Sequence, residues 1–254
     1  MTERTPPPPS TLVLWDIDLT LVDYSGLGKL WYDQVALAVL GVELAHVPAF
    51  PGRTERSIAV EVLEAHGVEW TEDHVERMFA ELVAIAAAAR PELPELGRAL
   101  PGAAAILRAL DERADVVQSL VTGNLPQLAD YKLAPFGLEH YLDLSVGGYG
   151  SLSTDRHELV SAAIRAAEAK YGARFAPGSV VVIGDTPHDV TAALHHGAVA
   201  VGVATGRHSA AELADSGAHL VLTDLSDTAA VLAALLGCTG SDVRGGGDQL
   251  PSRA

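Results

Sequence analysis

The sequence is poor in the residues that stabilise disulfide-rich or metal–thiolate proteins. Its 254 residues include a single cysteine, Cys238. One cysteine excludes an internal disulfide framework and a cluster of thiolate-bound metal. Cys238 lies just before a glycine-rich tail, and we interpret it as an incidental thiol.

Basic residues are also scarce, since 17 Lys and Arg stand against 33 Asp and Glu, for a formal net charge of −16. This balance argues against nucleic acid or an anionic membrane surface as a partner. The sequence has no apolar run of about 18 residues, and its first ten residues, MTERTPPPPS, lack the apolar segment of a signal peptide. We therefore expect a cytoplasmic protein without a membrane partner, and either a monomer or a homodimer fits the sequence.

Apolar residues are plentiful, at 48% of the chain, which is enough for a large core. One apolar run, Leu12 to Trp15, ends at two acids, Asp16 and Asp18, with one residue between them. A short continuous run of this kind indicates a strand buried on both faces. Two carboxylates at its end cost desolvation free energy unless a cation or donors compensate, so this strand end is the first candidate binding site.

Residues from about 25 to 95 show only helical patterns and loops, whereas strands and helices alternate afterwards. Strands are expected at 115–121, 142–146, 179–183, 199–203 and 219–222. This alternation predicts an α/β fold with a Rossmann-like parallel sheet between two helical layers. Right-handed crossovers would place the carboxyl ends of all these strands at one edge.

These patterns divide the chain into a core and an insertion. The α/β core comprises residues 11–24 and 96–237, and an all-helical segment at 25–95 interrupts it. The proline-rich residues 1–10 and the glycine-rich tail at 238–254 are expected to be disordered.

Polar residues follow four of the predicted strands, and a shared sheet edge would bring them together. They are Asp16, Asp18 and Thr20; Thr122, Gly123 and Asn124; Arg156; and Asp185 and Asp189. Carboxylate oxygens suit Mg²⁺. A metal combined with an arginine, a hydroxyl group and amide donors describes a site for a phosphoryl group.

This set of motifs resembles the haloacid dehalogenase superfamily, specifically its Mg²⁺-dependent phosphatases related to phosphoglycolate phosphatase. The family's four motifs are DxDxT, a Thr or Ser after a strand, a Lys or Arg at a helix start, and GDxxxD. They correspond to DIDLT at Asp16, Thr122 in SLVTGN, Arg156 in TDRHELV, and GDTPHD with Asp185 and Asp189. The resemblance covers Leu12 to Leu236 and implies that residues 25–95 form the family's cap domain.

Two positions depart from the family pattern. Leu19 replaces the glycine commonly found in DxDGT, which puts the turn geometry there in question. Arg156 stands where lysine is common, and a planar, bidentate guanidinium makes different contacts from a point-charge ammonium.

The resemblance also implies roles for the site residues. Asp16 is the expected nucleophile, forming a phosphoaspartyl intermediate, and Asp18 the general acid and base. The Mg²⁺ ligands would be Asp16, the Asp18 backbone carbonyl and Asp185, with Asp189 orienting the ligands or waters of the metal. Phosphate would be bound by Thr122, Gly123, Asn124 and Arg156, and Lys29 and Arg53 of the cap are candidates for contacting the substrate.

Each residue also has a plain structural interpretation. Asp16 and Asp18 could be solvated acids in a turn, Thr122 could cap a turn, Asn124 could be the N-cap of the helix after it, and Arg156 could be a surface arginine. For Asp185 and Asp189 the structural alternative is capping of the helix that follows.

The predicted function is hydrolysis of a small phosphorylated metabolite, and alternatives stay open. A phosphoglucomutase-like phosphoryl transferase shares the fold but must exclude water. A non-catalytic metabolite-binding protein would not need the intact acids Asp16, Asp18 and Asp185. Asp18 disfavours a carbon–halogen hydrolase, and phosphonate cleavage would need a cap lysine, for which Lys29 is the one candidate between Asp23 and Arg98.

Overall fold

The computed structural model describes residues 8–240. The segments expected to be disordered therefore lie largely outside the described residues. At the inner ends of these two segments, the expectation of disorder is wrong. The backbone N–H of Ser10 donates to the Asp115 carbonyl at 2.9 Å, and residues 238–240 belong to the last helix, α10 (Thr228–Gly240).

A six-stranded sheet forms the centre of the molecule, and each of its strand pairings is parallel. Its order is β5-β4-β1-β6-β7-β8, which places β1 between β4 and β6. All five residues of β1 are buried, as the continuous apolar run predicts. The strands are β1 (Thr11–Trp15), β4 (Val116–Thr122), β5 (Gly148–Tyr149), β6 (Val180–Gly184), β7 (Val199–Val203) and β8 (Leu220–Leu222).

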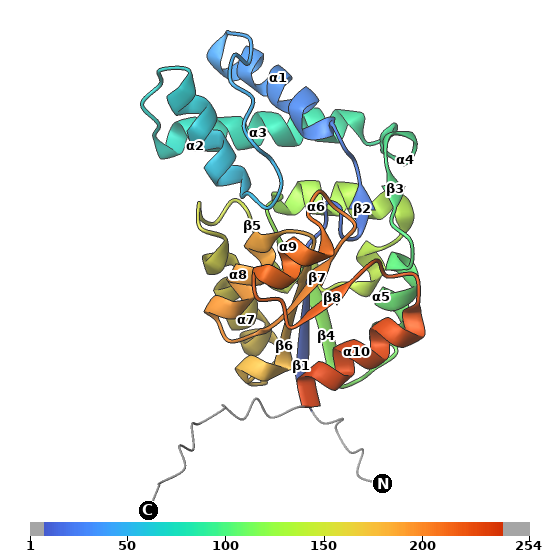
Figure 1. Ribbon diagram of the computed structural model, residues 1–254. Helices are drawn as coiled ribbons and strands as arrows, with labels where there is room; N and C mark the ends of the chain where they lie inside the picture. Colours follow the sequence, from blue (N-terminus) through green and yellow to red (C-terminus); the bar gives the residue numbers. More distant parts are fainter. Residues whose placement is uncertain (1–7, 241–254) are drawn as a thin grey trace, which may run out of the picture.

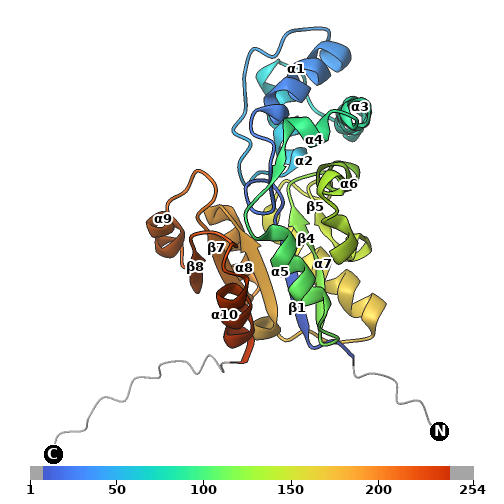
Figure 2. The same ribbon diagram turned by 90° about the vertical axis from the view of Figure 1, so that its right-hand side faces the viewer.

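Helices cover both faces of the sheet, which confirms the three-layer α/β/α prediction (Figures 1 and 2). Val13 and Trp15 of β1 face one hydrophobic cluster, whereas Leu12 and Leu14 face the other. The first cluster includes residues of α5 (Ala103–Asp111), α6 (Pro126–Leu133) and α10; the second includes residues of α7 (Arg156–Tyr171), α8 (Pro187–His195) and α9 (Ala210–Asp215). Short 3₁₀ turns are η1 (Ala134–Phe136), η2 (Glu139–Tyr141), η3 (Leu144–Val146) and η4 (Pro177–Ser179).

The inserted residues are helical, as predicted, and stand beyond the carboxyl edge of the sheet (Figures 1 and 2). They form α1 (Leu27–Leu40), α2 (Glu55–Ala65), α3 (Glu72–Ala89) and α4 (Leu93–Leu96). The Thr54 and Thr71 hydroxyls accept hydrogen bonds at the starts of α2 and α3, which is how threonine stabilises an N-cap.

Two short strands connect this helical segment to the core. β2 (Val22–Asp23) and β3 (Arg98–Ala99) pair antiparallel, so the chain leaves and re-enters the core at one place. Neither strand was expected from the sequence, because two residues carry no readable period. Among the described residues, no helix combines the length and apolarity needed to cross a membrane.

The strand expected at 142–146 is wrong. The chain there forms η3, and the strand β5 begins two residues later, at Gly148. Asp143 causes the difference, because its carboxylate accepts hydrogen bonds from the backbone N–H and the hydroxyl of Ser145, at 3.1 and 2.7 Å. Local side-chain bonds of this kind compete with strand formation.

Asp143 also supports the first stability prediction. Although burial alone would raise the pKa of Asp143, hydrogen bonds from Lys170, Tyr171 and Ser145 lower it to about 2. Asp143→Asn should therefore reduce the free energy of unfolding at pH 7 by about 1–2 kcal/mol. Because the folded-state pKa lies below the ordinary 3.8, this stabilisation is complete above pH 4 and disappears as the pH falls towards 2. Urea unfolding of both proteins at pH 7, 5 and 3 measures it; an equal difference at all three values would contradict the assignment.

Candidate active site

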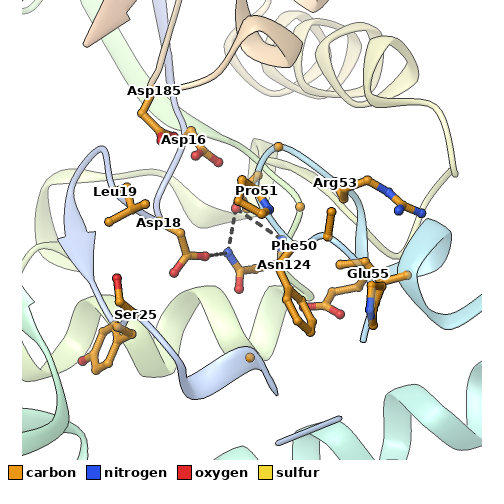
Figure 3. A pocket seen from close by; sticks show the side chains of 18 of the residues that line it. Asp16, Asp18, Leu19, Ser25, Phe50, Pro51, Arg53, Glu55, Asn124 and Asp185 are labelled. Carbon is orange, nitrogen blue, oxygen red and sulfur yellow. Dashed lines mark hydrogen bonds between the residues drawn. The ribbon is translucent and has the colours of Figure 1, made fainter. Parts of the chain in front are cut away.

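Three strands of the sheet end in polar residues that face one cleft (Figure 3). Asp16 follows β1, Thr122 ends β4 and Asp185 follows β6. The Asp16 backbone N–H donates to the Ile183 carbonyl at 2.8 Å, which ties the first strand end to the third. Asp16 and Asp185 are only 5% and 2% exposed, so the interpretation of Asp16 as a solvated turn acid is wrong.

Arg156 is a buried cation at the first position of α7. Its Nη2 donates to Asp16 Oδ1 at 2.8 Å, to Asp189 Oδ1 at 2.5 Å and to the Val121 carbonyl at 3.2 Å. The interpretation as a surface arginine is therefore wrong. Its buried Nε has no hydrogen-bond partner among residues 8–240, and a buried unpaired donor is costly. An anionic oxygen bound at this position would satisfy it.

The buried acids of this cluster are suited to a divalent cation. Asp16, Asp185 and Asp189 each offer an oxygen, and these atoms lie within 4.8 Å of one another. Burial raises the pKa of both Asp16 and Asp185, and nearby acids raise it further, although Arg156 acts in the opposite direction. One arginine cannot neutralise three carboxylates, and divalent cations compensate such clusters.

Within this cluster, Asp189 already has partners for both oxygens. Its Oδ1 accepts from Arg156, and its Oδ2 accepts from the backbone N–H and hydroxyl of Thr186 at 3.1 and 2.7 Å. Thr186 and Asp189 form a reciprocal capping box at the start of α8. Asp189 thus caps a helix and holds Arg156, and Asp16 and Asp185 are the better placed to bind an ion.

Asp18 lies in a second charge cluster, beside the first. Lys132 Nζ donates to both Asp18 oxygens, at 2.8 and 2.7 Å, and also to Asn124 Oδ1 at 2.7 Å. Asn124 Nδ2 in turn donates to Asp18 Oδ2 at 2.8 Å (Figure 3). The N-cap interpretation of Asn124 is wrong, because Leu125 is the N-cap of α6.

Lys132 was missed by the sequence interpretation, although the sequence contained a signal. Its neighbours on the buried face of α6 are Leu128, Ala129 and Leu133, so helical spacing places Lys132 among apolar positions. A lysine on the buried face of a helix requires a charge partner, and Asp18 is that partner.

The loop after β4 fits closely against the start of the helical segment. Thr122 Oγ1 accepts from the backbone N–H and side-chain amide of Asn124, at 3.3 and 2.9 Å, so its turn-capping role is real. The Gly123 carbonyl accepts from the Glu55 N–H at 2.9 Å. A Cβ atom at Gly123 would lie 1.9 Å from the Arg53 carbonyl oxygen, so only glycine allows this approach.

Comparison with known proteins shows which family this chain belongs to. The sequence model of the haloacid dehalogenase-like hydrolases matches residues 13–194. The chain belongs to this family. A search of curated proteins finds no match to the chain.

Solved structures similar to this haloacid dehalogenase-like hydrolase share its fold. A hydrolase from Pseudomonas syringae is 22% identical with a TM-score of 0.61, covering 89% of this chain and 99% of its own. A protein from Bacteroides vulgatus, with the inferred name β-phosphoglucomutase, is 18% identical with a TM-score of 0.64 and coverages of 92% and 91%. A protein from Haemophilus somnus, with the inferred name phosphoglycolate phosphatase, is 20% identical with a TM-score of 0.62 and coverages of 88% and 98%.

The first family motif contains the departure at Leu19, and the backbone there is unusual. Leu19 has φ of +60°, the one positive value among the non-glycine residues of the described chain. Its N–H donates to the Val22 carbonyl at 2.7 Å, and its carbonyl accepts from the Thr205 hydroxyl at 2.5 Å. The left-handed turn expected for glycine is therefore kept, with leucine in it.

This turn gives a matched stability test. Leu19→Gly and Leu19→Ala remove the same side-chain contacts, but only glycine relieves the left-handed strain, which costs about 1–2 kcal/mol. We expect the glycine variant to be more stable than the alanine variant by about 1 kcal/mol in urea unfolding. At an ordinary position the order is reversed, so an alanine variant of equal or greater stability would contradict the strained turn.

A cleft of about 410 Å³ separates the strand ends of this haloacid dehalogenase-like hydrolase from its helical segment. Lys29 lines it but is paired with Asp33 at 2.7 Å. Arg53 also lines it, yet its guanidinium points away from Asp16 and Asp185 (Figure 3). Its nitrogens donate to Glu61 and Ser57 instead. The expectation that Arg53 extends to the substrate therefore does not match this geometry.

Proposed function

We propose that this protein is a Mg²⁺-dependent phosphatase of small phosphorylated metabolites. The observation that carries the proposal is the convergence, at one cleft, of a buried nucleophile candidate, a second buried acid and a buried arginine. These are Asp16, Asp185 and Arg156, all of which line the cleft. Metal, cation and donor groups around one carboxylate are the parts that phosphoryl transfer requires.

The metal would be held by the Asp16 and Asp185 carboxylates and the Asp18 backbone carbonyl, with Asp189 orienting its other ligands. Their oxygen chemistry fits Mg²⁺. When bound, the ion supplies the positive charge that lets an anionic carboxylate approach an anionic phosphate.

The chemistry would proceed in two displacements. An Asp16 oxygen attacks phosphorus and the bond to the leaving oxygen breaks, while Asp18 gives its proton to that oxygen. Asp18 then takes a proton from a water molecule whose oxygen attacks phosphorus, and the bond to Asp16 breaks. Lys132, within 2.8 Å of both Asp18 oxygens, would position this acid and base.

The phosphate would be bound by groups on three segments. They are Arg156, Thr122, Gly123 and Asn124, all of which line the cleft. Residues 25–95 would act as a cap domain over residues 11–24 and 96–237, because their first loops complete the cleft wall. This division and a cytoplasmic location stay predictions from the sequence.

A phosphoglucomutase-like transferase is the second candidate. The Bacteroides vulgatus protein, which is named a β-phosphoglucomutase by inference, has the same fold as this chain. A mutase would convert one sugar phosphate into its isomer without releasing phosphate, and a non-catalytic binding protein would do neither. Product analysis with hexose phosphates separates the three functions.

The direct test uses a chromogenic aryl phosphate. The protein with Mg²⁺ should release phosphate, EDTA should reduce the rate at least about 100-fold, and excess Mg²⁺ should restore it. A rate that is unchanged after dialysis against EDTA would contradict the metal assignment. No release from any phosphate ester would contradict the phosphatase.

A further inference from the structure

Glu55, the first residue of α2, presents an acid to the cleft. Figure 3 shows Asp16 and Asp185 on one side of the pocket, and Glu55 beside Phe50 on another. Of the lining residues that the structure describes, Glu55 is the one carboxylate from the helical segment at 25–95. It has no part in the reaction proposed above.

The position of Glu55 is fixed by its neighbours. The buried Tyr32 hydroxyl donates to Glu55 Oε2 at 2.6 Å, and the Glu55 backbone N–H donates to the Gly123 carbonyl at 2.9 Å. The Tyr32 ring packs against Phe50 with centroids 5.6 Å apart. Both the backbone and one oxygen of Glu55 are therefore held in place.

Glu55 has unused acceptor capacity. No hydrogen bond from residues 8–240 reaches its Oε1. Burial raises the pKa of Glu55 to about 7, even though Tyr32 donates to it and Lys132 lies near enough to act against this rise. A half-buried carboxylate with one donor gains stability from any further donor.

The protein's own cations do not supply that donor. The lysines and arginines around this part of the cleft are paired elsewhere: Arg53 with Glu61, Lys132 with Asp18, and Lys29 with Asp33. A molecule bound in the cleft can therefore supply a donor to Glu55 Oε1 in place of solvent.

Accepting the phosphatase proposed above, we propose that Glu55 selects substrates whose leaving alcohol carries a hydrogen-bond donor, an ammonium or hydroxyl group, at its far end. The phosphate would lie at Asp16 and the donor at Glu55, in a cleft that Phe50 and Ile58 also line. The substrate class is phosphorylated amino alcohols and polyols. Leaving groups that end in a carboxylate are rejected, because like charges at close range are repelled.

The cleft also contains cations that would favour the opposite selectivity, a preference for substrates that end in a carboxylate. Lys29, whose side chain is 52% exposed, and the exposed Arg207 also line the cleft. If either of them captured the far end of the substrate, carboxylate-ended esters would be preferred. Measured selectivity therefore decides between Glu55 and these cations.

The experiment compares matched phosphate monoesters of two and four carbons, each ending in an ammonium, a hydroxyl, a methyl or a carboxylate group. With Mg²⁺ present and at a pH above the Glu55 pKa of about 7, where this acid is ionised, we expect kcat/KM for the ammonium or hydroxyl ester to exceed that for the carboxylate ester by about 10-fold or more at one or both lengths. A carboxylate preference, or equal rates for the four ends at both lengths, would overturn the inference.

Glu55→Gln should reduce the ammonium-to-carboxylate ratio about 10-fold, because the amide keeps the shape and loses the charge. Glu72→Gln is the matched control, since Glu72 is exposed on α3 and pairs with Arg56; its ratio should equal that of the native protein. An unchanged ratio in Glu55→Gln would overturn the role of Glu55. Absence of phosphate release from every ester would overturn the phosphatase as well, whereas release without selectivity overturns only this inference.

Discussion

Asp16→Asn is expected to lower kcat for aryl phosphate hydrolysis by about 10⁴-fold or more, the size of effect seen when a nucleophile is removed. Asparagine has nearly the same volume, and its carbonyl can still accept from Arg156, which contacts Asp16 at 2.8 Å. The amide cannot attack phosphorus at a useful rate, so chemistry is lost while the fold is kept. Initial rates with Mg²⁺ measure the effect.

Asp115→Asn is the matched control for this variant. Asp115 precedes β4, at the opposite edge of the sheet, and accepts a bond from Arg113. This substitution should leave the rate unchanged. If Asp16→Asn kept more than about a hundredth of the native rate with an unaltered unfolding curve, Asp16 would not be the nucleophile.

Replacing Arg156 with methionine should have the second largest effect. Arg156 is 7% exposed and contacts two carboxylates, Asp16 and Asp189, that are themselves buried. Removing one partner of a buried ion pair costs about 3–5 kcal/mol, because the remaining charges are left uncompensated. Urea unfolding in EDTA should show a loss of this size, together with a large fall in activity.

Two further variants separate charge from shape at this position. Arg156→Lys keeps the charge and should lose less stability than Arg156→Met, although one ammonium cannot reproduce the same contacts. Adding Asp189→Asn to Arg156→Met removes one of the unpaired acids and should recover part of the loss. If the double variant were no more stable than Arg156→Met, the ion pair with Asp189 would not be the source of the stability.

The sequence predicted the sheet well because its strands are buried on both faces. The run from Leu12 to Trp15 has no polar residue. The alternation of strands with helices then predicts that the strands are parallel. The exceptions are short or locally determined. β2 and β3 have two residues each, and Asp143 replaces an expected strand by a turn through its own side chain.

The candidate site was predictable only where motifs follow strands. Asp16, Asp185 and Arg156 come together because the strand ends share one edge. Lys132 and Glu55 lie on helices. Helical spacing places Lys132 on a buried face, but the long-range contacts with Asp18 and Tyr32 that give these two residues a role cannot be read from spacing. Arg53 is the opposite case, since the sequence made it a candidate for contacting the substrate. In the structure it pairs with Glu61, eight positions away in the chain.

The central claim is that Asp16 carries the phosphoryl group between the two displacements. The most direct measurement quenches the protein in acid during turnover, reduces acyl phosphates with borohydride to homoserine, and maps the modified peptide by mass spectrometry. We expect homoserine at position 16, and none in Asp16→Asn. Homoserine at another aspartate, or none at any position while phosphate is being released, would contradict the claim.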